Sequence, residues 1–168
     1  LTFSDGPTVN SGSGTNVNIF ASKHALDVGD YQDHYAVIAN GVESILGGTL
    51  TANGNLLVAG RAQQFSDFDQ AGGGTGLPDN MFALSLNPAT LDHLDDGVWN
   101  NGLAGNQAFD IAVAADGNSV LCGRSYGGID LGGGVVGSGE SELDAIVAGL
   151  GPTFEHRWSH GYGDDESH

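Results

Sequence analysis

Two stretches of eleven residues decide the fold. Residues 51–61 read Thr-Ala-Asn-Gly-Asn-Leu-Leu-Val-Ala-Gly-Arg, and residues 114–124 read Ala-Ala-Asp-Gly-Asn-Ser-Val-Leu-Cys-Gly-Arg. Each places an Asn-Gly or Asp-Gly pair before an apolar run, which is the strongest short-range signal for a β-hairpin because both central turn residues need positive φ. The second stretch begins 63 residues after the first. A hairpin that recurs at such a period is typical of an array or a propeller.

Further correspondences extend this period over the chain. Residues 18–21 match residues 80–83, and Pro88 matches Pro152. Small changes in the spacing are what loop insertions produce. The chain is therefore expected to be part of one β-propeller over residues 1–168, with a partial repeat at 1–47, a complete repeat at 48–110 and a repeat at 111–168 that is truncated before the next leading strand.

The composition limits the classes of partner. Four Lys and Arg residues stand against 21 Asp and Glu residues, so the formal net charge is −17. Nucleic acids and anionic membranes both need clustered basic side chains, and this chain offers none. The apolar fraction of 39% is sufficient for a packed core, and no apolar run is long enough for a membrane span. We expect neither nucleic-acid binding nor membrane insertion.

The pattern of apolar residues favours sheets. No segment shows helical periodicity with capping residues, and short apolar strands alternate with turns rich in Gly, Asn and Asp. Residues 56–59 and 145–148 are apolar on both faces, which indicates sheets covered on both sides. The expected fold is all-β, with about two to three four-stranded antiparallel blades of an incomplete β-propeller. A β-sandwich is the alternative, although a sandwich does not require internal repetition.

The order of these motifs resembles a known family. The series A-x-D-G-N-x-x-x-x-G, then D-L-G-G-G, then an apolar strand with a following Pro, then W-x-x-G-Y-G-D-D-E-S, is similar to the seven-bladed β-propeller (SBBP-type) repeat. Such repeats occur in tandem in large secreted and surface proteins of bacteria. The resemblance implies an extracellular, periplasmic or cell-surface location. It implies no shared catalytic residues, so no catalytic or cofactor-binding residue is assigned.

Several motifs suggest chemistry at first sight. Residues 123–127 fit G-x-S-x-G around Ser125, but a nucleophile elbow needs a strand-to-helix turn, and a Gly-rich β segment follows here. Residues 132–137 fit G-x-G-x-x-G without the following helix that a dinucleotide needs. His156 and His160 would stand roughly 13 Å apart on a strand, too far to share a metal ion.

Two single residues are assigned to the core. Cys122 is the only cysteine and occupies the strand position filled by Ala59 in the other hairpin, so we expect a small buried side chain. Trp158 is interpreted as a core or rim aromatic residue equivalent to Trp99.

Acidic clusters are the one pattern that points to a ligand. Calcium takes six to eight oxygen ligands, commonly carboxylates and loop carbonyls. No D-x-D-x-D-G loop is present, and excess Asp is also typical of a solvated surface. The candidate calcium ligands are Asp27, Asp30, Asp33, Asp164, Asp165 and Glu166.

Three functions are open. The first is a non-enzymatic structural or protein-binding propeller segment of a larger extracellular or surface protein or assembly. Its partners would be other protein chains or the remainder of its own polypeptide, because an unclosed propeller exposes sheet faces and edges. The alternatives are a calcium-assisted carbohydrate-binding propeller and a fragment of a propeller enzyme whose active site is completed elsewhere.

Overall fold

The protein is all-β. The computed structural model describes residues 19–37, 42–63, 68, 79–138 and 142–163, and these residues contain no helix. The strands are β1 (Ile19–His24), β2 (Tyr31–Val37), β3 (Glu43–Leu50), β4 (Leu56–Ala62), β5 (Asn80–Leu86), β6 (His93–Trp99), β7 (Gln107–Val113), β8 (Ser119–Tyr126), β9 (Ile129–Asp130), β10 (Val135–Val136), β11 (Leu143–Leu150) and β12 (His156–Tyr162). Every pairing among them is antiparallel.

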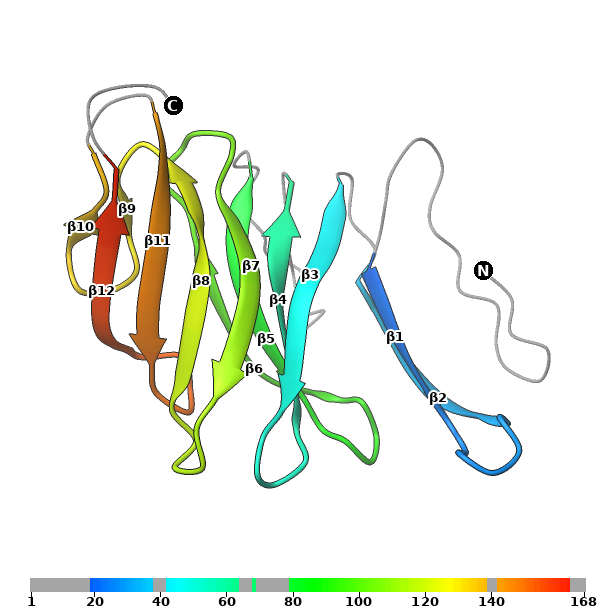
Figure 1. Cartoon of the computed structure of the whole chain (residues 1–168). Coiled ribbons are helices and arrows are strands. Elements are labelled where there is room, and N and C mark those ends of the chain that lie inside the picture. Colours follow the sequence, from blue (N-terminus) through cyan, green and yellow to red (C-terminus); the bar gives the residue numbers. More distant parts are fainter. Residues whose placement is uncertain (1–18, 38–41, 64–67, 69–78, 139–141, 164–168) are drawn as a thin grey trace.

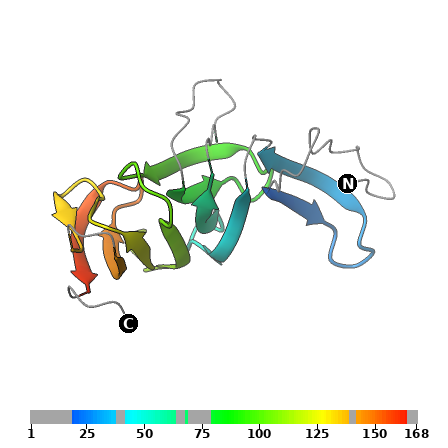
Figure 2. The ribbon, with the colours of Figure 1, turned by 90° about the horizontal axis from the view of Figure 1, so that it is seen from above.

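Two four-stranded sheets make up most of the molecule. Sheet 1 has the order β3-β4-β5-β6, and sheet 2 has the order β7-β8-β11-β12. The β1–β2 hairpin, sheet 1 and sheet 2 follow one another along the molecule, as Figure 2 shows from above. The small β9–β10 hairpin lies beside sheet 2 (Figure 1).

Both hairpins expected from the sequence are present. Residues 51–55 join β3 to β4, and residues 114–118 join β7 to β8. Gly54 and Gly117 have φ values of 84° and 86°, the left-handed conformation expected for the second residue of each pair. Asn53 and Asp116 do not have positive φ, so the expectation that both central residues adopt it is wrong. The amide of Gly54 donates to the carbonyl of Thr51, and the amide of Gly117 donates to that of Ala114. The two turns therefore close in the same way.

The sheets also share their irregularities. A bulge interrupts the first pair of strands between Ile45 and Gly47 in sheet 1, and between Ala108 and Asp110 in sheet 2. A second bulge precedes Leu86 in sheet 1 and Leu150 in sheet 2. Cross-strand register therefore assigns each residue of one sheet an equivalent in the other, with Ala59 equivalent to Cys122.

The expected boundaries do not coincide with the sheets. The division between residues 47 and 48 falls inside β3, and the division between 110 and 111 falls inside β7. Each sheet thus begins with a strand that precedes its Asn-Gly or Asp-Gly turn. The weakly patterned sequence of β3, with two adjacent glycines, gave no signal for this strand.

Two hydrophobic clusters hold the sheets together. The first lies between the sheets and includes Leu57, Ala83, Leu121 and Ile146. The second lies between sheet 1 and the β1–β2 hairpin and includes Phe82. Strand β5 is buried along its whole length because clusters cover both of its faces. Sheet 1 is thus covered on both sides, as apolar residues on both faces of β4 predicted. The same prediction from residues 145–148 is wrong among the described residues, because Ala145 on β11 is exposed.

Candidate interaction surface

One face of sheet 2 is apolar and uncovered in the described part of the chain. Along β8, Ser119, Leu121, Gly123 and Ser125 are buried, whereas the residues between them are exposed or half-buried. The buried set packs toward sheet 1. The opposite set, which we call the open face, comprises exposed or half-buried residues on β8, β11 and β12: Val120, Cys122, Leu143, Ala145, Val147 and Trp158.

The positions of sheet 1 that are equivalent to the β8 residues and to Ala145 and Val147 of the open face are buried. Register makes Leu57 and Met81 equivalent to Val120 and Ala145. Leu57 is 6% exposed because sheet 2 packs on it, whereas Val120 is 44% exposed. The difference arises from what covers each sheet, since both positions carry a branched apolar side chain.

Cys122 corrects an expectation from the sequence. It was expected to be buried like Ala59, and its thiol is exposed. Its cross-strand neighbours are Asp110 and Val147. The apolar run predicted the strand, but no local signal states whether another sheet covers that face.

Trp158 is the second correction. Trp99 pairs with Met81 in sheet 1, and the residue that pairs with the equivalent Ala145 is Tyr162. Trp158 instead pairs with Gly149 and is 42% exposed. A Cβ atom on Gly149 would lie 2.2 Å from the indole Nε1, so the ring lies flat over this glycine. Aromatic contacts with His160, and from His160 to Tyr162, continue along β12.

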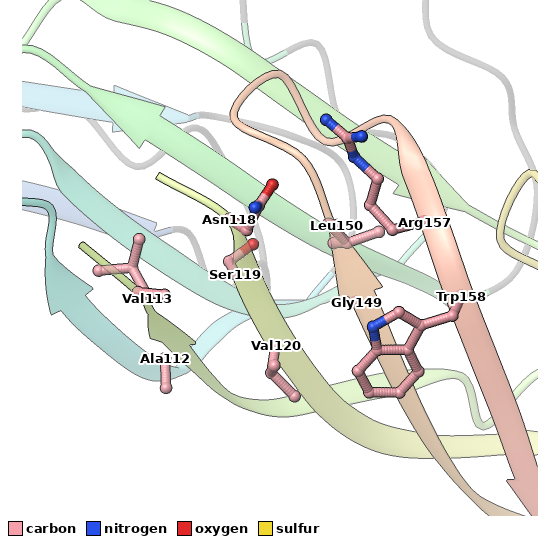
Figure 3. Close-up of a pocket in the computed structure, with 10 residues that line it drawn as sticks. Ala112, Val113, Asn118, Ser119, Val120, Gly149, Leu150, Arg157 and Trp158 are labelled. Atoms are coloured by element: carbon pink, nitrogen blue, oxygen red, sulfur yellow. The ribbon is translucent and has the colours of Figure 1, made fainter. Parts of the chain in front are cut away.

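A hollow of about 520 Å³ adjoins Trp158 at the turn end of the open face. Its walls come from the ends of four strands and include Val120, Leu150, Arg157 and Trp158 (Figure 3). Ser119 also lines it, and the Ser119 hydroxyl is buried without a hydrogen-bond partner among the described residues. The hollow therefore combines an aromatic platform, an apolar wall and a guanidinium.

One guanidinium and two carboxylates lie near the hollow. The Arg157 guanidinium lies 2.9 Å from the Glu155 carboxylate. A hydrogen bond from the Thr153 hydroxyl and the nearby Arg157 charge both hold the pKa of Glu155 below its usual value. Hydrogen bonds from Asn118 lower the pKa of Asp116, and Arg157 adds to this effect. The open face carries one carboxylate on β7, that of the exposed Asp110, which pairs across the strands with Cys122.

The structure gives Ser125 a structural role. Its side chain is buried, and its Oγ lies 2.8 Å from Asn106 Oδ1 and 2.7 Å from the Gly127 carbonyl oxygen. Asn106 also donates to the carbonyl of Asp79, which precedes β5 of sheet 1. These hydrogen bonds hold the segment between β6 and β7 against both sheets. Among the described residues, the hydrogen bonds of Ser125 involve no histidine, and no helix follows it.

The other glycine motif and the histidines are also part of the scaffold. Residues 132–137 span the β9–β10 hairpin, where the Asp130 carboxylate accepts the amides of Gly132 and Gly134. These two bonds lower the pKa of Asp130. His156 lies 3.0 Å from the Ser159 hydroxyl on β12, at the strand position that its spacing predicted.

The calcium candidates lie at two places. Asp27 and Asp30 belong to the turn between β1 and β2, and Asp33 lies on β2 opposite Lys23. Among the residues that the structure describes, no group of three His, Cys, Asp or Glu side chains is close enough to hold a metal ion. Asp164, Asp165 and Glu166 lie outside the described residues. Calcium binding stays a hypothesis.

No model of a known protein family matches the chain, and no curated protein matches it. The similarity to SBBP-type repeats therefore depends on the quoted residues alone. In the described ranges, no helix is long and apolar enough to cross a membrane.

Proposed function

We propose that the chain is a non-enzymatic structural and protein-binding segment of a β-propeller in a larger extracellular or surface protein or assembly. The observation that carries this proposal is the open face of sheet 2. Its residues Val120, Cys122, Ala145 and Val147 are equivalent to residues that are buried on sheet 1, where the next sheet packs. The occupant of the open face is accordingly a further β-sheet, supplied by another stretch of polypeptide or by another chain.

The shared architecture of the sheets supports the assignment as propeller blades. Both sheets have four antiparallel strands in sequential order from β3 and from β7, and both have the same two bulges. Sheet 1 contacts sheet 2 through the face that is equivalent to the open face, and sheet 2 contacts sheet 1 through its opposite face. The same arrangement therefore continues when another sheet is added. The extracellular location follows only from the resemblance to SBBP-type repeats.

The open face also has the chemistry of a docking surface. Large exposed apolar patches on soluble proteins mark interaction sites. Val120, Leu143 and Trp158 are each more than two fifths exposed.

A matched pair of variants tests the proposal by sedimentation velocity and by binding of a dye that recognises apolar surfaces. Val120 on the open face is 44% exposed, and Val98 on β6 is 41% exposed. We expect the chain to self-associate and to bind the dye when its occupant is absent. Val120→Glu should abolish both properties, whereas Val98→Glu should preserve them. A compact monomer that binds no dye would contradict the proposal.

A further inference from the structure

Two turns carry a large apolar side chain in an unusual backbone conformation. Leu91 lies in the turn between β5 and β6, with φ 53°, and Phe154 lies in the turn between β11 and β12, with φ 58°. The left-handed region is unfavourable for such residues unless the surroundings stabilise it. Both side chains are 6% exposed. Their burial offsets the unfavourable conformation.

Each of these side chains packs into the cluster on the preceding layer. Leu91 belongs to the cluster between sheet 1 and the β1–β2 hairpin. Phe154 belongs to the cluster between sheet 2 and sheet 1. In two places, a side chain from the turn between the last two strands of a sheet thus belongs to the hydrophobic cluster that this sheet shares with the preceding sheet or hairpin.

The contact of Phe154 on sheet 1 can be located. A Cβ atom on Gly97 would lie 3.1 Å from the Phe154 Cβ and 2.5 Å from the Trp99 ring. Gly97 therefore lies beneath both side chains. The site consists of a strand glycine, a tryptophan folded over a glycine and one apolar side chain from the next sheet.

Sheet 2 has the first two parts of such a site without the third. Trp158 is folded over Gly149, and the hollow beside it is open. Gly149 is equivalent to Ser85, which lies two residues along β5 from Ala83, the partner of Gly97. The hollow is thus displaced by two cross-strand pairs toward the turn end of the sheet, and its glycine lies on the third strand of the sheet instead of the fourth.

We propose that this hollow receives a large apolar side chain from the turn between the last two strands of the docking sheet. This inference depends on the proposed function. The residue after each turn side chain in this chain is acidic, Asp92 after Leu91 and Glu155 after Phe154. Arg157 borders the hollow and is one of only four Lys and Arg residues. The docking turn therefore carries a large apolar residue followed by Asp or Glu, and this acidic residue comes near Arg157, which pairs with Glu155 within sheet 2.

An extended chain tests the inference. A copy of residues 106–163 appended after His168 places each copied residue 63 positions after its original, which keeps the spacing between the two sheets. Trp99→Phe in the original and Trp158→Tyr in the copy leave the original Trp158 as the only tryptophan. Cys122→Ala in the copy leaves one thiol. The measurements are acrylamide quenching of Trp158 fluorescence and the reaction rate of Cys122 with a thiol reagent.

We expect both readouts to fall severalfold in the extended chain relative to the parent with Trp99→Phe. Phe154→Ala in the copy should restore quenching of Trp158 and leave Cys122 protected. If Trp158 stays accessible while Cys122 is protected, the inference about the hollow is wrong and the proposed function stands. If both stay accessible, the docking of a further sheet is wrong.

A peptide covers the case in which the appended sheet does not fold. Cyclised residues 148–159 with Trp158→Tyr present the turn of Phe154 in isolation. Added to the parent chain with Trp99→Phe, the peptide should shift Trp158 emission to the blue, and its Phe154→Ala version should not. Equal effects of the two peptides would overturn the inference. A shift with a neutral oligosaccharide alone would reassign the hollow to a sugar.

Discussion

Ala59 and Cys122 occupy equivalent positions in two sheets of the same order, yet Ala59 is fully buried and Cys122 is exposed. Ala59 lies between Gly47 and Ala83, and Cys122 lies between Asp110 and Val147. The strands around both residues are paired in the same register. The cross-strand neighbours differ in their side chains, and the two residues differ in exposure because, in the described part of the chain, a neighbouring sheet covers only Ala59.

The first prediction concerns thiol reactivity. Native Cys122 should react with a thiol reagent at a rate close to that of the unfolded chain, because nothing in the described structure covers it. In a Cys122→Ala background, Ala59→Cys should place the thiol at the buried equivalent position and slow the reaction by orders of magnitude. Equal rates in the folded state of the two proteins would show that sheet 2 does not cover Ala59 in solution.

The second prediction concerns the glycine that precedes Arg in both hairpins. A Cβ atom on Gly60 would lie 1.9 Å from the Ser44 carbonyl oxygen, and one on Gly123 would lie 2.1 Å from the Gln107 carbonyl oxygen. The bulge in the neighbouring strand brings these carbonyls close. Gly60→Ala and Gly123→Ala should each lower the free energy of unfolding by about 1–3 kcal/mol, measured in denaturant.

Ala145→Val provides the control for these substitutions. Ala145 is exposed on the open face, so added methyl groups meet no neighbouring sheet. A branched residue suits an exposed strand position, and the free energy of unfolding should change by no more than about 0.5 kcal/mol. A similar loss in all three variants would mean that the carbonyl contacts do not set the need for glycine.

The third prediction separates a structural serine from a catalytic one. Ser125→Ala removes the hydroxyl that bonds with Asn106 and leaves that buried amide short of a partner. The free energy of unfolding should fall by about 1–2 kcal/mol. Asn106→Ala with Ser125→Ala should cost less than the sum of the two single variants, since they share one network. An additive result would show that the two side chains do not interact.

Much of the fold was predictable from local signals. The Asn-Gly and Asp-Gly pairs predicted both hairpins, and Gly54 and Gly117 have the positive φ that these turns need, whereas Asn53 and Asp116 do not. The apolar run after the Asp-Gly pair predicted strand β8. The all-β class followed from these patterns and from the absence of helical periodicity.

The remaining features depend on contacts between segments far apart in the chain. Strand β3 has no clear alternation because Gly47 faces the backbone of Asp110, where a Cβ atom would lie 2.5 Å from its Cα. The exposure of Cys122 and the hollow at Trp158 depend on which sheet covers which face. Local sequence patterns describe single strands, so they do not reveal these features.

The last prediction concerns Glu43, which is equivalent to Asn106. Glu43 pairs across the strands with Ala62, where sheet 2 has Ser125, so the hydroxyl that bonds with Asn106 has no counterpart. The Glu43 side chain is 1% exposed, and both carboxylate oxygens lack a hydrogen-bond partner among the described residues. Burial raises the pKa of Glu43 from 4.5 to about 7.

The sign of the pH dependence follows from this shift. Between pH 4.5 and about 7 the folded chain holds a proton that the unfolded chain has released, so Glu43 makes the folded state less stable as the pH rises. Glu43→Gln keeps the shape and removes the titration. It should leave the free energy of unfolding nearly unchanged at about pH 4 and raise it by about 1–3 kcal/mol at about pH 8. Ala62→Ser should act in the same direction, because its hydroxyl can donate to the ionised Glu43 carboxylate as Ser125 bonds with Asn106. Denaturant unfolding of the three proteins across this range is the measurement, and parallel pH profiles for the parent and Glu43→Gln would show that the carboxyl is ionised without cost in the fold.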